Sequence, residues 1–134
     1  MIIDMQEAIK NKTAHPADTP ADVKIAIKDL NLYYGSFHAL HGINLDIERG
    51  KITAFIGPSG CGKSTLLNIL GCMDELTSGS YFFDGEDITR LKSKAGAALR
   101  NEKIGYVFQA FNLVNEISAL ENVCMPLGYA GVSK

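Results

Sequence analysis

The sequence predicts an α/β domain whose N-terminal part is an antiparallel β subdomain. Two segments, residues 23–27 and 43–47, alternate apolar with polar side chains, as strands with one buried face do. A short apolar run over residues 51–57 then indicates a strand buried on both faces of a sheet. A glycine-rich loop and a helical pattern follow this run directly, so a strand, a loop and a helix occur in succession.

Composition restricts the class of protein. The chain has 134 residues, of which 46% are hydrophobic and 21% charged, which suits one globular domain or part of a larger one. A net charge of −2 provides no general basic field, so we do not expect nucleic acid as a partner. Three cysteines without a CxxC pair predict neither a disulfide framework nor a zinc site, and they suit a reducing cytosol.

The first 22 residues differ from the rest of the chain. They are polar and interrupted by Pro16 and Pro20, which predicts a flexible or weakly helical leader at 1–22 and places the domain at 23–134. Acidic Asp4 and Glu7 argue against a signal peptide, and no later run is long enough to cross a bilayer. Any membrane role is therefore expected to come through a partner.

The first predicted elements are two half-buried antiparallel strands. Val23, Ile25 and Ile27 share one face of the first strand, and residues 43–47 repeat the pattern before a turn at residues 48–50. Beyond the glycine-rich loop, residues 64–70 read as a helix that stops at Gly71.

A hairpin and a further helix are predicted next. Residues 80–83 and Ile88 flank the pair Asp84-Gly85, a strong signal for a short hairpin turn. Residues 91–102 have helical composition despite Gly96, and residues 104–108 are a compact strand candidate.

The last predicted element is a helix with a marked start. Ser118 and Glu121 have the spacing of a capping box before an apolar stretch. Pro126 and Gly128 should cut this helix short.

The segment GPSGCGKS, residues 57–64, carries the clearest chemistry. It matches G-x-x-x-x-G-K-[ST] and lies between a predicted strand and a predicted helix, the context that gives this motif its meaning. Glycines let backbone N–H groups turn inward around phosphate oxygens, and the helix adds its positive N-terminal dipole. Lys63 can reach the β and γ phosphates of a nucleotide, and the Ser64 hydroxyl can bind a bridging Mg²⁺.

Several other interpretations of this loop are weaker. A glycine-rich turn with an incidental lysine would not need the strand and helix around it. A GTPase should also carry an Asn-Lys-x-Asp segment, whereas the Asn11-Lys12 pair lacks the aspartate and precedes the loop. Small-molecule kinases usually begin close to their phosphate loop, but here two alternating strands come first. Cys61 lies where the backbone does the binding, so a redox role is the less favoured interpretation.

Further motifs around the loop make a family resemblance specific. Tyr34-Gly35, residues 38–40, INLDIERG, GPSGCGKST and GYVFQ occur in an order that is similar to the ATP-binding subunits of ABC transporters. The resemblance covers nearly everything from residue 24 to residue 134. It implies a P-loop NTPase fold with an ABC-type ATPase core, and ATP and Mg²⁺ as cofactors.

The resemblance also implies roles for individual residues. Tyr34 occupies the position of an aromatic ring that stacks on adenine, with neighbouring Tyr33 as its rival, and Gln109 matches the Q-loop glutamine that serves Mg²⁺ or a water molecule. The expected metal ligands are thus Ser64 and Gln109. The expected nucleotide-binding residues are Tyr34, Gly57, Pro58, Ser59, Gly60, Cys61, Gly62, Lys63, Ser64, Thr65 and Gln109.

The likeness to subfamilies is divided between the two halves of the chain. FHALHGINLDIERGKITAFIGPSGCGKSTLL looks most like phosphate-import ATPases. TSGSYFFDGEDIT and the segment from LRNEKIGYVFQ onward look more like ATPases of lipoprotein-releasing and macrolide or peptide exporters. Transport substrate and direction are therefore left open between import and export.

Hydrolysis in this family resembles a two-subunit sandwich that needs residues not found in this sequence. These are an LSGGQ-like signature, a second Mg²⁺-binding aspartate, a water-polarising glutamate and a switch histidine. Asp74-Glu75 imitates the carboxylate pair, but its preceding apolar residues are needed for the helix, which predicts a solvated turn. We expect a chain that stops before the helical subdomain is complete, and that binds ATP without hydrolysing it by itself.

The resemblance finally implies partners and a location. Transmembrane permease subunits or domains and a second ATP-binding subunit are the expected partners of the complete protein, at the cytoplasmic face of the cell membrane. The alternative is a non-hydrolysing nucleotide-binding fragment or pseudo-subunit.

Overall fold

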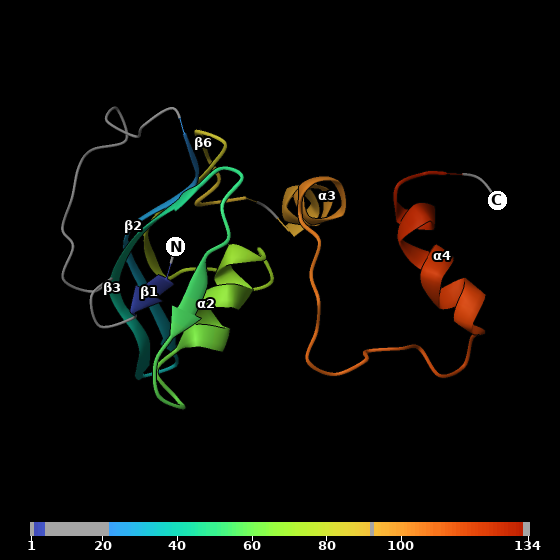
Figure 1. Cartoon of the computed structure of the whole chain (residues 1–134), viewed down its shortest axis with the longest axis horizontal. Coiled ribbons are helices and arrows are strands. Elements are labelled where there is room, and N and C mark those ends of the chain that lie inside the picture. Colours follow the sequence, from blue (N-terminus) through green and yellow to red (C-terminus); the bar gives the residue numbers. More distant parts are fainter. Residues whose placement is uncertain (1, 5–21, 92, 133–134) are drawn as a thin grey trace. The chain divides into compact units, whose positions relative to one another are not determined.

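The computed structural model describes residues 2–4, 22–91 and 93–132. The chain divides into two compact units, residues 1–91 and residues 92–134, which are described separately (Figure 1). The first unit contains β1 (Ile2–Asp4), β2 (Val23–Tyr34), β3 (Phe37–Glu48), β4 (Ala54–Ile56), α2 (Lys63–Leu70), β5 (Ser78–Phe83) and β6 (Glu86–Asp87). The second unit contains α3 (Ser93–Lys103) and α4 (Ala119–Tyr129).

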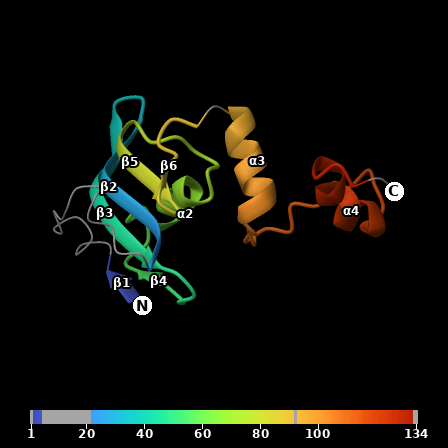
Figure 2. The ribbon, with the colours of Figure 1, turned by 90° about the horizontal axis from the view of Figure 1, so that it is seen from above.

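The main sheet of the first unit is antiparallel, with the strand order β3-β2-β5-β6 (Figure 2). Within it, Ile25 pairs with Ile47 and Ile27 pairs with Leu45. The predicted antiparallel strands are confirmed, because the two alternating apolar patterns lie opposite each other in register.

The core of the first unit lies between this sheet and α2, which packs against β3. On the helix, Leu66, Ile69 and Leu70 are the buried residues, at the three- and four-residue spacing of one helix face. The largest fully buried side chains are Ile27, Leu30, Leu32, Leu40, Ile43, Leu66 and Ile69. Packing of α2 on the sheet thus holds the start of α2, and the loop that leads into it, in a defined place.

A buried amide holds the irregular part of the β2–β3 pair. The register shifts between Ile27 and Leu30, and Asp29 has a φ of 46°. The Asn44 side chain, only 7% exposed, accepts a hydrogen bond from the Asp29 N–H at 3.0 Å. It also donates to the Gly42 carbonyl at 3.0 Å. These bonds satisfy backbone groups that the strand ladder leaves unpaired at the bulge.

The end of α2 is fastened to the sheet. Gly71 is its C-cap, as predicted, and Cys72 after it adopts a φ of 52°. The Cys72 N–H bonds to the Ile69 carbonyl at 2.9 Å and the Met73 N–H to the Asn68 carbonyl at 2.8 Å, the pattern of a Schellman motif. The C-terminal carbonyl of Leu70 accepts a hydrogen bond from the Tyr81 hydroxyl of β5 at 2.8 Å. Burial of this phenol raises its pKa.

The predicted hairpin is confirmed at Asp84-Gly85, where both residues have positive φ and Phe83 pairs with Glu86. The Asp84 carboxylate forms ion pairs with Lys24 of β2 and with Arg49. Its pKa is lowered, first by the hydrogen bond from Lys24 and then by that from Arg49. One turn residue therefore connects the hairpin to the start of β2 and the end of β3.

The expectation of a doubly buried strand at residues 51–57 is wrong. The strand is limited to β4, and Ile52 and Ile56 are 89% and 51% exposed. Among the described residues, β4 pairs only with β1, in parallel, in a two-stranded sheet. A strand becomes buried on both faces only where other layers cover both of them, and the described chain provides no such cover for Ile52.

The leader predicted at 1–22 has one regular element within the described residues. Ile2–Asp4 form β1, with Ile3 opposite Phe55 of β4. Two of the three residues of β1, Ile2 and Ile3, are apolar and β-branched, so this part of the otherwise polar leader suits a strand. Residues 5–21, where the leader was expected to be flexible or weakly helical, lie outside the described residues.

In the second unit, the helix predicted at 91–102 is found as α3, residues Ser93–Lys103. The strand predicted at residues 104–108 is not formed. Tyr106 and Phe108 instead place their rings against each other at 4.7 Å, while Val107 between them is 95% exposed. A strand needs a neighbouring strand to complete its ladder, and none of the described strands pairs with this segment.

Helix α4 begins as predicted and ends later than predicted. Ser118 and Glu121 form the capping box in both directions, and Glu121 accepts from the Ser118 N–H at 2.9 Å. The helix continues through Pro126 and Gly128 to Tyr129. An interior proline removes one backbone hydrogen bond and crowds the preceding turn, but its φ is helical. The Pro126 carbonyl remains in the ladder and accepts from the Ala130 N–H at 3.1 Å.

Candidate functional site

The glycine-rich loop lies between β4 and α2, as the sequence predicts. Gly62 is the N-cap of α2, with a φ of 91° and no side-chain cap. The Gly62 carbonyl accepts the first helical hydrogen bond, from the Leu66 N–H at 2.8 Å. The N–H groups of Lys63, Ser64 and Thr65 in the first turn have no intrahelical acceptor by their position. This end of the helix is therefore a set of free donors with the positive pole of the helix dipole behind them.

Gly62 also fits against β3. A Cβ placed on it would lie 2.8 Å from Cδ2 of Leu40 and 3.6 Å from the carbonyl oxygen of Ala39. Leu40 is itself 2% exposed. The glycine is thus required by close packing as well as by its positive φ, and it sets the distance between the loop and the sheet.

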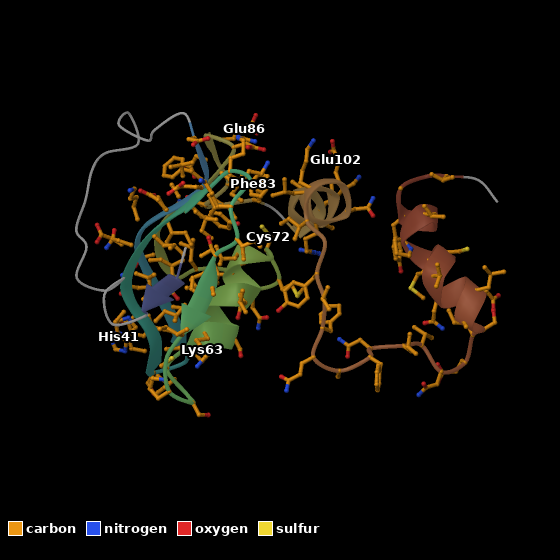
Figure 3. The ribbon with its side chains drawn as sticks, viewed as in Figure 1. His41, Lys63, Cys72, Phe83, Glu86 and Glu102 are labelled. Carbon is orange, nitrogen blue, oxygen red and sulfur yellow. The ribbon has the colours of Figure 1, made fainter. Side chains whose placement is uncertain are left out.

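The Lys63 side chain lies across the loop that precedes it (Figure 3). Its ammonium group donates to the carbonyl oxygens of Gly57 and Pro58, at 2.8 Å each, and lies 3.5 Å from Sγ of Cys61. The positive charge of Lys63 is thus bound only by neutral acceptors among these loop groups. A phosphate oxygen is a stronger acceptor for an ammonium group than a carbonyl oxygen, so these contacts can be exchanged for it.

Cys61 packs against the first residues of the loop, Gly57 and Pro58. A Cβ on Gly57 would lie 2.7 Å from Sγ of Cys61, and the Cys61 N–H bonds to the Pro58 carbonyl at 3.4 Å. The thiol is half-buried and fills space that the missing side chain of Gly57 leaves open. Packing against Gly57 therefore accounts for the position of this thiol.

The residues of this loop suit a phosphate group and a divalent cation. Gly60 and Gly62 both have positive φ, 81° and 91°, which turns successive N–H groups to one side as in an anion-binding nest. Ser59, Gly60 and Ser64 are exposed, and Thr65 is half-buried. The Ser64 hydroxyl is an oxygen ligand of the type that Mg²⁺ accepts. The donor set thus fits Mg²⁺ together with the phosphates of a nucleotide.

Tyr34 lies at the end of β2 and is 48% exposed. Its hydroxyl donates a hydrogen bond to Oδ2 of Asp74 at 2.6 Å. This hydrogen bond raises the pKa of the phenol, burial and the negative charge of Asp74 act in the same direction, and Thr65 acts in the opposite direction. Interaction with Thr65, in the first turn of α2, places the Tyr34 hydroxyl beside the helix that carries the loop.

The rival tyrosine has a different environment. The Tyr33 ring stacks on His38 at 3.9 Å with an interplanar angle of 11°, and the His38 ring lies 3.7 Å from that of His41. The Tyr33 N–H donates to Oγ1 of Thr77 at 3.0 Å. Its ring face is therefore already used within the sheet, whereas Tyr34 makes no ring contact of this kind among those found in the described chain.

Gln109 is an exposed residue of the second unit, between α3 and α4. The phosphate loop, Tyr34 and Asp74 all belong to the first unit. The structure therefore brings Tyr34 close to Thr65 and the start of α2, and it leaves the expected partnership of Gln109 with Ser64 as a prediction.

Asp74 is the residue of this region to which the sequence analysis assigned no role in the site. A solvated turn was predicted there, and Glu75 is indeed exposed, but Asp74 is half-buried and binds Tyr34. The two residues are 40 positions apart, so no local pattern indicated the contact.

Across the described residues, no group of three His, Cys, Asp or Glu side chains is arranged to hold a metal ion. Nor does any described helix combine the length and apolar character needed to cross a membrane.

Comparison with known proteins agrees with this geometry. The sequence model described as ABC transporter matches residues 40–133. The chain is 50% identical over 99 residues to the ABC transporter ATP-binding protein YknY of Bacillus subtilis (strain 168), covering 74% of this chain and 43% of YknY. It is 58% identical over 92 residues to the macrolide export ATP-binding/permease protein MacB of Syntrophobacter fumaroxidans, covering 69% of this chain and 13% of that protein.

A solved structure shows the same fold. The dimeric structure of MJ0796, a bacterial ABC transporter cassette, has a TM-score of 0.74 and 39% sequence identity, over 82% of this chain and 48% of the cassette. The chain thus spans about half the length of this cassette and less than half of YknY. Its fold is that of an ABC ATPase cassette of the P-loop NTPase class over the part it contains, and the chain belongs to the ABC transporter family.

Proposed function

We propose that this chain belongs to the nucleotide-binding domain of an ABC exporter ATPase and that it binds Mg²⁺-ATP. The observation that carries the proposal is the phosphate loop. Three features occur together in this loop. The N–H groups at the start of α2 have no side-chain cap, two loop glycines have positive φ, and the Lys63 ammonium group lies against the loop carbonyls. All three features favour a polyphosphate anion.

Each part of the loop has a role in this proposal. The backbone N–H groups of residues 57–65, except Pro58, which has none, hold phosphate oxygens. Lys63 moves from the Gly57 and Pro58 carbonyls to the β and γ phosphates. Ser64 binds the Mg²⁺ ion that bridges these phosphates, and Gln109 serves the same ion in the assembled protein.

Tyr34 is the proposed adenine-stacking residue. Its ring is half exposed and its hydroxyl interacts with Thr65 of α2, so the ring lies near the helix that follows the phosphate loop. Tyr33 is the weaker candidate because its face is stacked on His38. An aromatic ring with one free face is suited to a purine base.

Export is the proposed direction of transport. The support is the similarity to MacB proteins, which are described as macrolide export ATP-binding/permease proteins. Phosphate import is the other candidate, and it rests on the resemblance of residues 37–67 alone. We further propose permease and second-cassette partners, since MacB is an ATP-binding/permease protein and MJ0796 was solved as a dimer. The corresponding location is the cytoplasmic face of the cell membrane.

We propose that the 134-residue chain binds ATP but does not turn it over by itself. Asp74 and Glu75, the acidic pair that imitates the catalytic carboxylates, lie in the turn after α2, and Asp74 is engaged by Tyr34. This placement supports a structural role for Asp74 and provides no general base for water at the phosphate loop. A non-hydrolysing nucleotide-binding subunit is the alternative with the same binding site.

Replacing Lys63 with alanine tests the binding proposal. Hydrogen bonds to charged groups contribute about 1.5–3 kcal/mol each, so we expect roughly ten- to hundredfold weaker Mg²⁺-ATP binding. Isothermal titration calorimetry on the full chain measures the change. Lys51→Ala is the matched control, because Lys51 is an exposed lysine outside the loop and its removal should leave the affinity unchanged.

Equal affinities of the wild type and Lys63→Ala would contradict the proposed phosphate site. Sustained phosphate release by the wild-type chain, lost in Lys63→Ala, would contradict the proposal that the chain binds without turnover.

Replacing Tyr34 with alanine tests the base site. Base-on-ring stacking contributes about 1–3 kcal/mol, and stacking does not read the edge of a base. We therefore expect weaker binding of both ATP and GTP, by roughly five- to hundredfold. Tyr33→Ala should affect nucleotide affinity much less. A loss confined to one nucleotide, or a larger loss in Tyr33→Ala, would reject Tyr34 as the stacking residue.

A further inference from the structure

We propose that Asp74 is a positioning residue of the nucleotide site, which holds the Tyr34 ring in its stacking orientation through the Tyr34 hydroxyl. The proposal rests on the proposed base-stacking role of Tyr34 and adds a second residue to that site. It assigns a function to an acidic residue that sequence reasoning placed in a solvated turn.

The first step is the geometry of the acceptor. Oδ2 of Asp74 accepts from the Tyr34 hydroxyl at 2.6 Å, a short bond of the kind formed by a hydroxyl and an ionised carboxylate. Oδ1 of the same carboxylate accepts from the Glu75 N–H at 2.9 Å. With both oxygens engaged, the carboxylate has little rotational freedom.

The second step is the rigidity of the segment that carries Asp74. It follows the end of α2, where the Met73 N–H is bonded to the Asn68 carbonyl and the Leu70 carbonyl to the Tyr81 hydroxyl of β5. Asp74 therefore projects from a helix end that is fixed to the main sheet. A fixed acceptor can transmit its position to the side chain that donates to it.

The third step concerns the freedom of Tyr34. Its backbone is held by pairing with Phe37 of β3 at the end of the hairpin, but its side chain is 48% exposed. An exposed tyrosine has two free torsions, and ordering a side chain at a binding site costs about 0.5–1.5 kcal/mol. The bond to Asp74 removes this freedom before a ligand arrives, which makes the ring a preorganised surface.

The protonation state of Tyr34 allows its hydroxyl to donate to Asp74. A tyrosine phenol is already protonated at neutral pH, and the Asp74 hydrogen bond raises the pKa of the Tyr34 phenol further. Among the groups that affect it, Thr65 belongs to the first turn of α2. The Tyr34 hydroxyl is thus bonded to Asp74 in the turn after α2 and lies near Thr65, in the first turn of α2.

A double-mutant cycle tests the proposal. The full chain is compared as wild type, Asp74→Ala, Tyr34→Phe and the double variant, each titrated with ATP and Mg²⁺ at neutral pH. If Asp74 acts through the hydroxyl, each single substitution should weaken binding about two- to tenfold, the affinity equivalent of ordering one side chain. The double variant should bind no more weakly than either single variant.

Two further measurements separate positioning from folding. Asp74→Asn keeps the side-chain volume and an acceptor for the Glu75 N–H, and it should weaken binding less than Asp74→Ala. The pKa of the Tyr34 phenol, followed by difference absorbance against Tyr34→Phe, should fall in Asp74→Ala. The control is Glu75→Gln, which removes the neighbouring exposed charge and should change neither affinity nor phenol pKa.

Each outcome has a distinct meaning. The same loss of affinity from Asp74→Ala in the wild-type chain and in the Tyr34→Phe variant, or no loss in either, overturns the positioning role and leaves the proposed function intact. Absence of ATP binding by the wild-type chain overturns the proposed function and this inference with it. Loss of affinity in Asp74→Ala that disappears once the Tyr34 hydroxyl is removed supports the inference.

Discussion

Replacing Gly79 with alanine is expected to destabilise the first unit severely. Gly79 lies in β5 with a φ of 106°. An added Cβ would lie 2.6 Å from the Asp29 carbonyl oxygen, 2.7 Å from the Leu30 Cα and 2.7 Å from the Lys28 carbonyl oxygen. All three are backbone atoms of β2, which cannot move away without disturbing the β2–β5 pairing. Positive φ costs about 1–2 kcal/mol and overpacking about 1–3, so a loss of roughly 2–5 kcal/mol is expected.

Urea unfolding followed by circular dichroism measures the loss in Gly79→Ala. Gly85→Ala is the matched control, because Gly85 also has a positive φ, 81°, but no atom within 4 Å of an added Cβ. The difference between the two variants therefore isolates the backbone clash. Equal free energies of unfolding for the two variants would show that close approach of β2 and β5 does not account for Gly79.

Replacing Ile27 with alanine is the second large stability change. Ile27 is 0% exposed in the central part of β2, where it lies between Leu45 of β3 and Tyr81 of β5. Removing its side chain loses buried apolar contact and leaves a cavity that strands on both sides cannot close. Such substitutions cost about 2–5 kcal/mol.

The same atoms can be removed from an exposed position as a control. Ile52 is 89% exposed, and we expect Ile52→Ala to change the free energy of unfolding by less than about 0.5 kcal/mol. Urea unfolding of both variants gives the comparison. A cost for Ile52→Ala as large as that for Ile27→Ala would mean that Ile52 is buried in solution.

Several features of this protein follow from short stretches of sequence. Asp84-Gly85 forms its hairpin, Ser118 and Glu121 form their capping box, and Gly71 ends α2. The alternation over residues 23–27 and 43–47 likewise identified the paired strands. In each case the interacting groups are close in sequence or the pattern repeats with the period of the element, so local chemistry is sufficient.

Other features depended on what lies opposite in space. The apolar run at residues 51–57 reads as a buried strand, but Ile52 is exposed because burial requires covering layers. Residues 104–108 have strand composition, but none of the described strands forms a ladder with them. Helix α4 continues past Pro126 to Tyr129, and the Pro126 carbonyl remains in the helical ladder by accepting from the Ala130 N–H. Composition by itself does not contain these facts.

The candidate site divides in the same way. GPSGCGKS, read with the apolar run before it and the helical pattern after it, by itself determined the phosphate loop, because the glycines, the lysine and the helix start act through neighbouring backbone groups. Only the tertiary structure decided which acidic residue accepts the hydrogen bond from the Tyr34 hydroxyl. Asp74 lies 40 positions away in sequence, and the packing of α2 against the sheet brings it close to Tyr34. A hydrogen bond between distant segments is specified by packing, and packing is a property of the whole unit rather than of either segment.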